Sequence, residues 1–131
     1  MQFILESFGN ARTIHNANAS RFGKYTELQF TDRGRLAGAK TLDYYLERSR
    51  VAGPSPGERN FHVFYYLVAG ASAEERHHLR LTGDSSSYRL LGARAGLAAK
   101  GGAVTDDGVR FEQLKQAFKL VGLSKRLVAQ I

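Results

Sequence analysis

Residues 16 to 21, with the sequence NANASR, concentrate side chains that could hold a phosphate group and a metal ion. The amides of Asn16 and Asn18 can donate hydrogen bonds to phosphate oxygens, and the hydroxyl of Ser20 is a hard oxygen ligand of the kind that Mg²⁺ prefers. The guanidinium of Arg21 can pair with a carboxylate through two parallel hydrogen bonds. On the residues alone two interpretations stay open: a loop that senses a nucleotide with its Mg²⁺, and an asparagine-rich turn without a ligand.

A second segment, GRLAGAKT at residues 34–41, comes close to the phosphate-binding pattern G-x-x-x-x-G-K-[ST]. Ala39 replaces the glycine that precedes the lysine in that pattern. A Cβ there obstructs the backbone conformation that wraps phosphates, and the segment follows a turn instead of a strand. We therefore expect a return strand here and no phosphate loop.

The histidines do not have the spacing of a metal site. The chain contains no cysteine, which excludes disulfides and thiolate ligands. The adjacent His77 and His78 would point to different faces of a helix, although Glu74 is near in sequence. His15 and His62 belong to no such pattern either, and no Ser-His-Asp or paired-carboxylate arrangement is fixed by the sequence.

The composition is that of a folded, basic domain. The chain has 131 residues, 43% of them hydrophobic, and a net charge of +7. Two interpretations of this charge stay open: an anionic partner such as a nucleotide phosphate, a nucleic acid or an acidic protein surface, and a solvated surface that is basic by chance or because acidic neighbours are missing. No apolar run reaches the length of a membrane span, and we expect no signal peptide. Aromatic and basic residues could stack on single-stranded nucleic acid, although core packing of Phe22 and Tyr25 is the simpler expectation. The residues concerned are Phe22, Lys24, Tyr25 and Arg33.

The elements on both sides of the NANASR loop follow from the apolar pattern. Residues 3–8 predict a helix that Gly9 ends with a left-handed cap. The alternation in residues 25–30 predicts a strand, and residues 31–35 a hairpin turn. Residues 36–46 are expected to return as a strand that drifts into a short helix around residues 46–50.

Two further helices are expected beyond a breaker cluster at residues 53–57. The first ends at Gly70, and the second is capped by Gly122 and followed by a short helix with Ser124 as its N-cap. Residues 82–108 are rich in Gly, Ser and Ala and predict a long mobile loop. The apolar positions that indicate the two helices are Phe61, Phe64, Tyr65, Val68 and Ala69 in the first, and Phe111, Leu114, Phe118 and Val121 in the second.

Taken together, these stretches resemble the myosin motor head. ESFGNARTIHNANASRFGKY resembles the segment that ends in the switch I loop, LERSRV and GERNFHVFYYLVAGAS resemble the stretch behind it, and FEQLKQAFKLVGLSKRLVAQI resembles the continuation. Residues 18–51 are most similar to the motor heads of fungal chitin synthases, which join a myosin-like head to a membrane-embedded glycosyltransferase. Residues 82–108 match the family poorly.

The resemblance implies a role for each residue of the loop, with ATP and Mg²⁺ as cofactors. Asn16 matches the asparagine that contacts the nucleotide phosphates, and Asn18 is grouped with it as a cofactor-binding residue. Ser20 matches the serine that ligates Mg²⁺. Arg21 matches the arginine that closes an ion pair with a switch II glutamate. Ala19 departs from the family, because conventional myosins carry a second serine at this position beside the attacking water.

The resemblance also implies that residues 1–131 are part of a larger head. We expect the phosphate loop and switch II to lie outside this segment, so that the segment alone does not hydrolyse ATP. Apolar faces that pack on the rest of the head, including Phe61 with Phe64 or Phe111 with Phe118, are then expected to be exposed.

The expected fold class is α/β: part of a P-loop motor domain, in which a strand hairpin from a larger central sheet is flanked by several helices. The expected function is that of an ATP-dependent, actin-based motor attached to a chitin synthase, on the cytoplasmic face of the plasma membrane or of secretory vesicles. The alternatives are a degenerate head that tethers actin or another partner without hydrolysis, which Ala19 favours, and a basic nucleic-acid-binding module.

Overall fold

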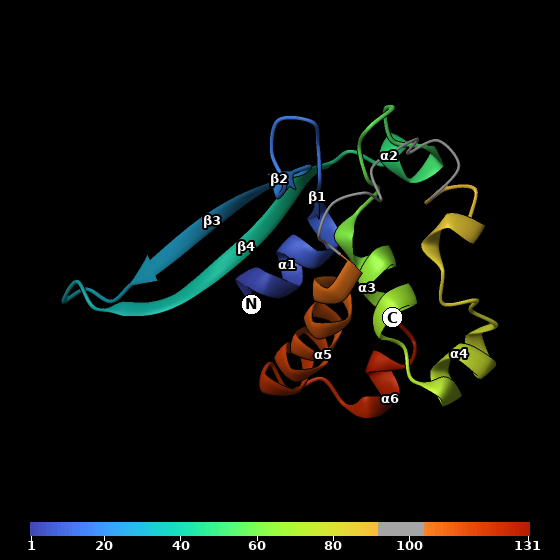
Figure 1. Cartoon of the computed structure of the whole chain (residues 1–131). Coiled ribbons are helices and arrows are strands. Elements are labelled where there is room, and N and C mark those ends of the chain that lie inside the picture. Colours follow the sequence, from blue (N-terminus) through green and yellow to red (C-terminus); the bar gives the residue numbers. More distant parts are fainter. Residues whose placement is uncertain (92–103) are drawn as a thin grey trace.

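The computed structural model describes residues 1–91 and 104–131 as a helical body from which a two-stranded ribbon projects (Figure 1). Helices and strands are mixed along the chain. In order, the elements are α1 (Gln2–Gly9), β1 (Asn10–Ala11), β2 (Ala19–Ser20), β3 (Phe22–Phe30), β4 (Leu36–Leu46), α2 (Ser49–Ala52), α3 (His62–Gly70), α4 (Ala73–Leu79), the 3₁₀ turn η1 (Ser85–Ser87), α5 (Val104–Leu120) and α6 (Lys125–Val128).

The core lies where α3 packs along α5, and α1 contacts both helices. Leu114 on α5 is fully buried, and Phe118 packs against Phe8 of α1 with ring centroids 6.2 Å apart. Phe61 and Phe111 are buried as well. The expectation that these aromatic faces are exposed is therefore wrong, because α3 and α5 cover each other without further chain; Phe64 alone of the named residues stays half-buried.

The structure contains two small antiparallel hairpins. The short one pairs β1 with β2, and the long one pairs β3 with β4 from Phe22↔Leu46 at its base to Phe30↔Leu36 at its tip. The near-match to a phosphate loop thus lies in a turn and a return strand, as predicted. The short helix expected around residues 46–50 is present as α2, but it begins at Ser49, because pairing with β3 keeps the backbone extended to Leu46.

Both faces of the long hairpin, which we call the ribbon, expose large apolar side chains. Tyr25 is 59% exposed, so core packing does not hold for it in this structure. The ribbon makes its main contacts at its base, where the Cβ of Phe22 approaches the backbone of Gly9. A Cβ on Gly9 would lie 2.6 Å from that atom, which explains a glycine at this point better than the predicted left-handed cap. The residue after α1, Asn10, is extended.

The caps expected at Gly122 and Ser124 are confirmed. Gly122 has a φ of +85°, and the amide of Leu123 donates to the carbonyl of Phe118 at 3.0 Å, which is the hydrogen bond of a Schellman motif. The hydroxyl of Ser124 accepts a hydrogen bond from the amide of Leu127 at 3.3 Å and so caps α6. Gly70, in contrast, is the last residue of α3 and is followed by an extended cap at Ala71.

The segment predicted as a loop at residues 82–108 is only partly loop. Helix α5 already begins at Val104, and Asp106 and Asp107 in its first turn favour a helix start because carboxylates stabilise helix N-termini. The prediction for residues 92–103 lies outside the described residues. Within the described part of the chain, no helix combines the length and hydrophobicity needed to cross a bilayer.

Candidate functional site

The predicted site residues lie on one short hairpin. Strands β1 and β2 pair Asn10 with Ser20 and Ala11 with Ala19, which brings the two ends of the intervening loop together. Asn16 and Asn18 are in this loop, Ser20 ends β2, and Arg21 follows it directly. The amide of Arg21 donates to the carbonyl of Gly9 at 2.8 Å, so the loop is anchored to the end of α1.

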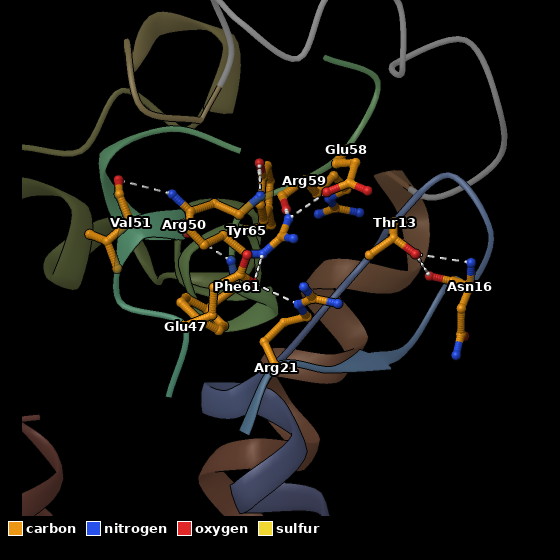
Figure 2. Close-up of polar contacts among 11 residues, drawn as sticks. Thr13, Asn16, Arg21, Glu47, Arg50, Val51, Glu58, Arg59, Phe61 and Tyr65 are labelled. Carbon is orange, nitrogen blue, oxygen red and sulfur yellow. Dashed lines mark hydrogen bonds and ion pairs between the residues drawn. The ribbon is translucent and has the colours of Figure 1, made fainter. Parts of the chain in front are cut away.

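Asn16 stabilises the tip of the loop with its backbone and one side-chain atom. Its carbonyl accepts hydrogen bonds from the amide and the hydroxyl of Thr13, at 2.9 and 3.2 Å, and its amide donates to that hydroxyl at 3.1 Å (Figure 2). Its side-chain oxygen accepts from the amide of Asn18 at 2.9 Å. Within the described residues the side-chain NH₂ of Asn16 has no hydrogen-bond partner, and the residue is exposed. This NH₂ is therefore available to a ligand.

The side chain of Asn18 forms hydrogen bonds with the protein body. Its Oδ1 accepts from the side-chain amide of Asn10 at 3.1 Å and lies 3.1 Å from Nε2 of His62. Its Nδ2 donates to a carboxylate oxygen of Glu6 at 3.4 Å. Asn18 thus contacts α1, β1 and α3 at once.

His62 meets this asparagine as a neutral imidazole. Burial lowers the pKa of His62 to about 4, and the nearby charge of Arg59 acts in the same direction while Glu6 opposes it. Because Oδ1 of Asn18 is an acceptor, we assign the ring proton to Nε2. The imidazole also stacks on Tyr66, with centroids 5.7 Å apart and an interplanar angle of 5°.

Ser20 presents an exposed hydroxyl at the end of β2. It donates to the carbonyl of Phe22 at 2.8 Å. Donation occupies the hydroxyl proton and leaves the oxygen lone pairs free, which is the state in which a serine can ligate a cation. Among the described residues, no three side chains of the His, Cys, Asp and Glu types gather closely enough to bind a metal on their own.

Arg21 is held by an ion-pair cluster that consists of Arg21, Glu47, Arg50 and Glu58 (Figure 2). One oxygen of Glu47 accepts from Nε of Arg21 at 2.6 Å and from Nε of Arg50 at 2.8 Å. The Arg50 guanidinium, only 4% exposed, also reaches Glu58 at 2.9 Å and the carbonyl of Arg59 at 3.0 Å. The hydrogen bond from Arg21 is the main cause that lowers the pKa of Glu47, and the same bond raises the pKa of Arg21.

A cleft of about 330 Å³ lies behind the loop, between α1, α3 and the start of α5. Its charged lining is largely paired: Arg59 bonds to Asp107 at 2.6 Å and covers the ring of Tyr65 at 3.8 Å. Arg110 reaches Asp106 at 3.4 Å. Asn18 and His62 both line this cleft, so the loop forms part of the lining of the cleft.

Comparison of the sequence with known proteins identifies its family. The family model described as the myosin head (motor domain) matches residues 2–131. The chain belongs to the myosin head family. Among its relatives are proteins named chitin synthase 5 of Cryptococcus neoformans and chitin synthase 8 of Mycosarcoma maydis, 59% and 56% identical over 99% of the chain, and the myosin IA heavy chain of Dictyostelium discoideum, 44% identical over 98% of the chain.

This myosin-head chain spans 6% of the length of each of the two chitin synthases and 13% of the length of that myosin heavy chain.

The sequence analysis identified the loop but missed the residues that hold it. Glu47, Arg50 and Glu58 come from the LERSR and GER stretches, whose alternating charges were a signal that was not used. His62 was considered only as a metal ligand, and its partner Asn18 could not be inferred from a separation of 44 residues.

Proposed function

We propose that residues 13–21 form the nucleotide-responsive switch I loop of an ATP-dependent, actin-based motor. The observation that carries the proposal is that some polar groups of the loop are free to bind a ligand, whereas others are held by the protein. The NH₂ of Asn16 and the lone pairs of Ser20 face outward and lack partners in the described residues, whereas Arg21 is held through its Nε by Glu47. Both groups are exposed, so each can exchange bound water for a ligand.

The donor set fits Mg²⁺ bound together with phosphate. Mg²⁺ keeps several waters and takes phosphate oxygens together with few protein oxygens, so the Ser20 hydroxyl would be one protein ligand of a site that the rest of the motor head completes. The bound ion would neutralise charge on the phosphates of ATP. Asn16 would donate to a phosphate oxygen, and Arg21 would pair through its Nη atoms with a carboxylate of a switch II segment.

The exposed ribbon supports a place in a larger α/β motor. Its two strands leave their outer edges without strand partners among the described residues, and edges of this kind pair readily with further strands. We propose that the ribbon joins the central sheet of a P-loop motor domain whose phosphate loop and switch II segment complete the nucleotide site.

The partners follow from the same proposal. An actin filament would be the track, and the identity to the two chitin synthases favours an attached glycosyltransferase anchored in the plasma membrane or secretory vesicles, with the head on the cytoplasmic face. The parent protein would then combine a myosin-type ATPase with chitin synthesis.

The test is binding of a fluorescent ATP analogue, in millimolar Mg²⁺, to the complete motor head that carries residues 1–131. A charge-assisted contact contributes about 1.5 to 3 kcal/mol, so Ser20→Ala and Asn16→Ala should each weaken binding by about 10-fold to 150-fold. Ser55→Ala, which changes an exposed serine between α2 and α3, is the control. Equal affinity of Ser20→Ala and Ser55→Ala would contradict the proposal.

A second function, a head that binds ATP and a partner without turnover, is favoured by Ala19. This residue has a backbone carbonyl but no hydroxyl to relay a proton from the attacking water. In the same head, actin cosedimentation that responds to ATP without release of phosphate would select the tethering function. Restoration of phosphate release by Ala19→Ser would locate the deficit at this position.

A further inference from the structure

We infer that Asn18 is a positioning residue, which fastens the loop to the protein body through His62 and leaves ligand binding to Asn16 and Ser20. The inference deepens the proposed function and rests on it for the role of the loop. It replaces the expectation that both asparagines contact the cofactor.

The first step is a complete account of the hydrogen bonds of Asn18. Its amide donates to Asn16 at 2.9 Å, and its carbonyl accepts from Nδ2 of Asn10 at 3.3 Å. Its Oδ1 accepts from Asn10 and His62, and its Nδ2 donates to Glu6. Every polar atom of Asn18 therefore already has a protein partner, and a phosphate contact would require it to break one of them.

The second step is the rigidity of those partners. Asn10 is 6% exposed and His62 is 8% exposed, so neither can exchange its contact with Asn18 for water without moving. The stacking of His62 on Tyr66 fixes the plane of the imidazole. A rigid donor at Nε2 and a second at Asn10 hold the same oxygen from two elements, which fixes both the position and the direction of the Asn18 side chain.

The third step is the contrast between the two asparagines, which lie two positions apart in one loop. Asn16 leaves its NH₂ without a partner in the described residues, whereas the NH₂ of Asn18 is directed at Glu6. A carboxylate beside the amide also disfavours the approach of a phosphate, because two anions would share one donor. The loop thus has an outward-facing ligand side at Asn16 and Ser20 and an anchoring side at Asn18.

The test is hydrogen exchange of the backbone amides of the 131-residue chain. Asn18→Ala removes the anchor, and we expect the amides of Thr13 and Asn16 to exchange at least 10-fold faster. Asn16→Asp is the matched control, because it keeps the Oδ1 acceptor for the Asn18 amide and should leave these rates within about 2-fold of wild type. Unchanged exchange in Asn18→Ala would overturn the inference.

If the α5 amides of Asn18→Ala also lose their protection, the variant has unfolded and cannot test the loop. A second pair of variants serves in that case. His62→Gln retains an N–H close to the position of Nε2, whereas His62→Leu retains bulk without a donor. We expect His62→Gln to keep the slow exchange of the loop that His62→Leu loses. Equal loop exchange in these two variants would also overturn the inference.

A kinetic split separates this inference from the proposed function. In the complete motor head, Asn18→Ala should lower kcat by at least 10-fold, through a poorly placed Ser20 and Arg21, and His62→Gln should retain most of it. If loop exchange responds as expected but Ser20→Ala leaves nucleotide binding unchanged, the positioning role of Asn18 stands and the nucleotide proposal fails. If nucleotide binding depends on Ser20 but hydrogen exchange in the loop does not change in Asn18→Ala, the nucleotide proposal stands and the positioning role of Asn18 fails.

Discussion

Arg50 shows at the scale of one residue why the loop keeps its place. Its side chain is only 4% exposed and neutralises two carboxylates, those of Glu47 and Glu58. Breaking a buried ion pair by removal of one partner leaves the other charge uncompensated and typically costs about 3 to 5 kcal/mol. Because Glu47 also orients Arg21, loss of Arg50 would affect a residue of the proposed site that it does not touch.

We expect Arg50→Met to lower the free energy of unfolding of the 131-residue chain by about 3 kcal/mol near neutral pH, measured by urea denaturation. Arg48→Met is the control, because Arg48 is exposed and only two positions away. Its effect should stay within about 0.5 kcal/mol. Similar losses in the two variants would show that the cluster does not stabilise the fold.

The pH dependence of this difference follows from the lowered pKa of Glu47. The group contributes stability that is fully present above its ordinary pKa of 4.5 and is lost as the pH falls through the lower folded-state value. In Arg50→Met the carboxylate has one partner fewer, so the variant has less of this stability to lose. The gap between wild type and Arg50→Met should therefore narrow below pH 4.5.

Glycines set the spacing between elements. A Cβ on Gly70 would overlap with the side chain of Phe111, so α3 and α5 can approach this closely only because position 70 has no side chain. Gly108 lies in the same contact, but a Cβ there would meet the carbonyl oxygen of Ala69 at an ordinary 3.7 Å. One glycine of this interface is therefore required by packing, whereas the other is not.

We expect Gly70→Ala to destabilise the chain by about 1 to 3 kcal/mol, the usual cost of overpacking a core. Gly108→Ala should be neutral or stabilising by up to about 1 kcal/mol, because alanine favours a helix interior more than glycine does. Thermal unfolding of the two variants beside wild type measures both effects. A Gly70→Ala chain as stable as Gly108→Ala would mean that α3 and α5 are not in close contact at Gly70.

The sequence predicted those features that depend on residues close together in the chain. The caps at Gly122 and Ser124 and the hairpin turn before residue 36 follow from short-range geometry, and all three are present. The short helix after the returning strand begins later than expected, at Ser49, because Leu46 is still paired with Phe22, which lies 24 positions before it. Burial of Phe111 was misjudged for a similar reason, since the partner helix was identified but its docking was not.

Residue types at Asn16, Ser20 and Arg21 predict contacts with a phosphate, a cation and a carboxylate, and this remains a prediction. The structure adds the residues that support the loop, which the sequence analysis did not name. The ion pair of Arg21 with Glu47 spans 26 positions. Contacts at this separation depend on how the elements pack, so the charged LERSR and GER stretches could mark candidates for the supporting residues, but their pairing with Arg21 is seen only in the structure.

At the scale of the whole molecule, the ribbon and the body differ in how they bury apolar surface. The body encloses its aromatic residues between α1, α3 and α5, whereas the ribbon exposes large apolar side chains, and its outer edges have no strand partner among residues 1–91 and 104–131. Figure 1 shows the ribbon projecting from the body. The exposed residues of the ribbon are Tyr25, Leu28, Phe30, Leu36, Leu42, Tyr44, Tyr45 and Leu46. Apolar surface of this extent on a free edge favours association with further strands or with a second ribbon.

We therefore expect the 131-residue chain to self-associate through the ribbon. Leu28 and Leu36 are 57% and 62% exposed, and burial of one such side chain contributes about 1.5 to 3 kcal/mol. The double variant Leu28→Lys/Leu36→Lys should weaken association by at least about 10-fold in sedimentation velocity, without a change in the thermal midpoint of the body. Leu120→Lys is the control, because Leu120 is 87% exposed at the end of α5. Equal weakening by both changes would indicate nonspecific aggregation, and association confined to chains with an intact ribbon would identify the ribbon as the surface through which the chains associate.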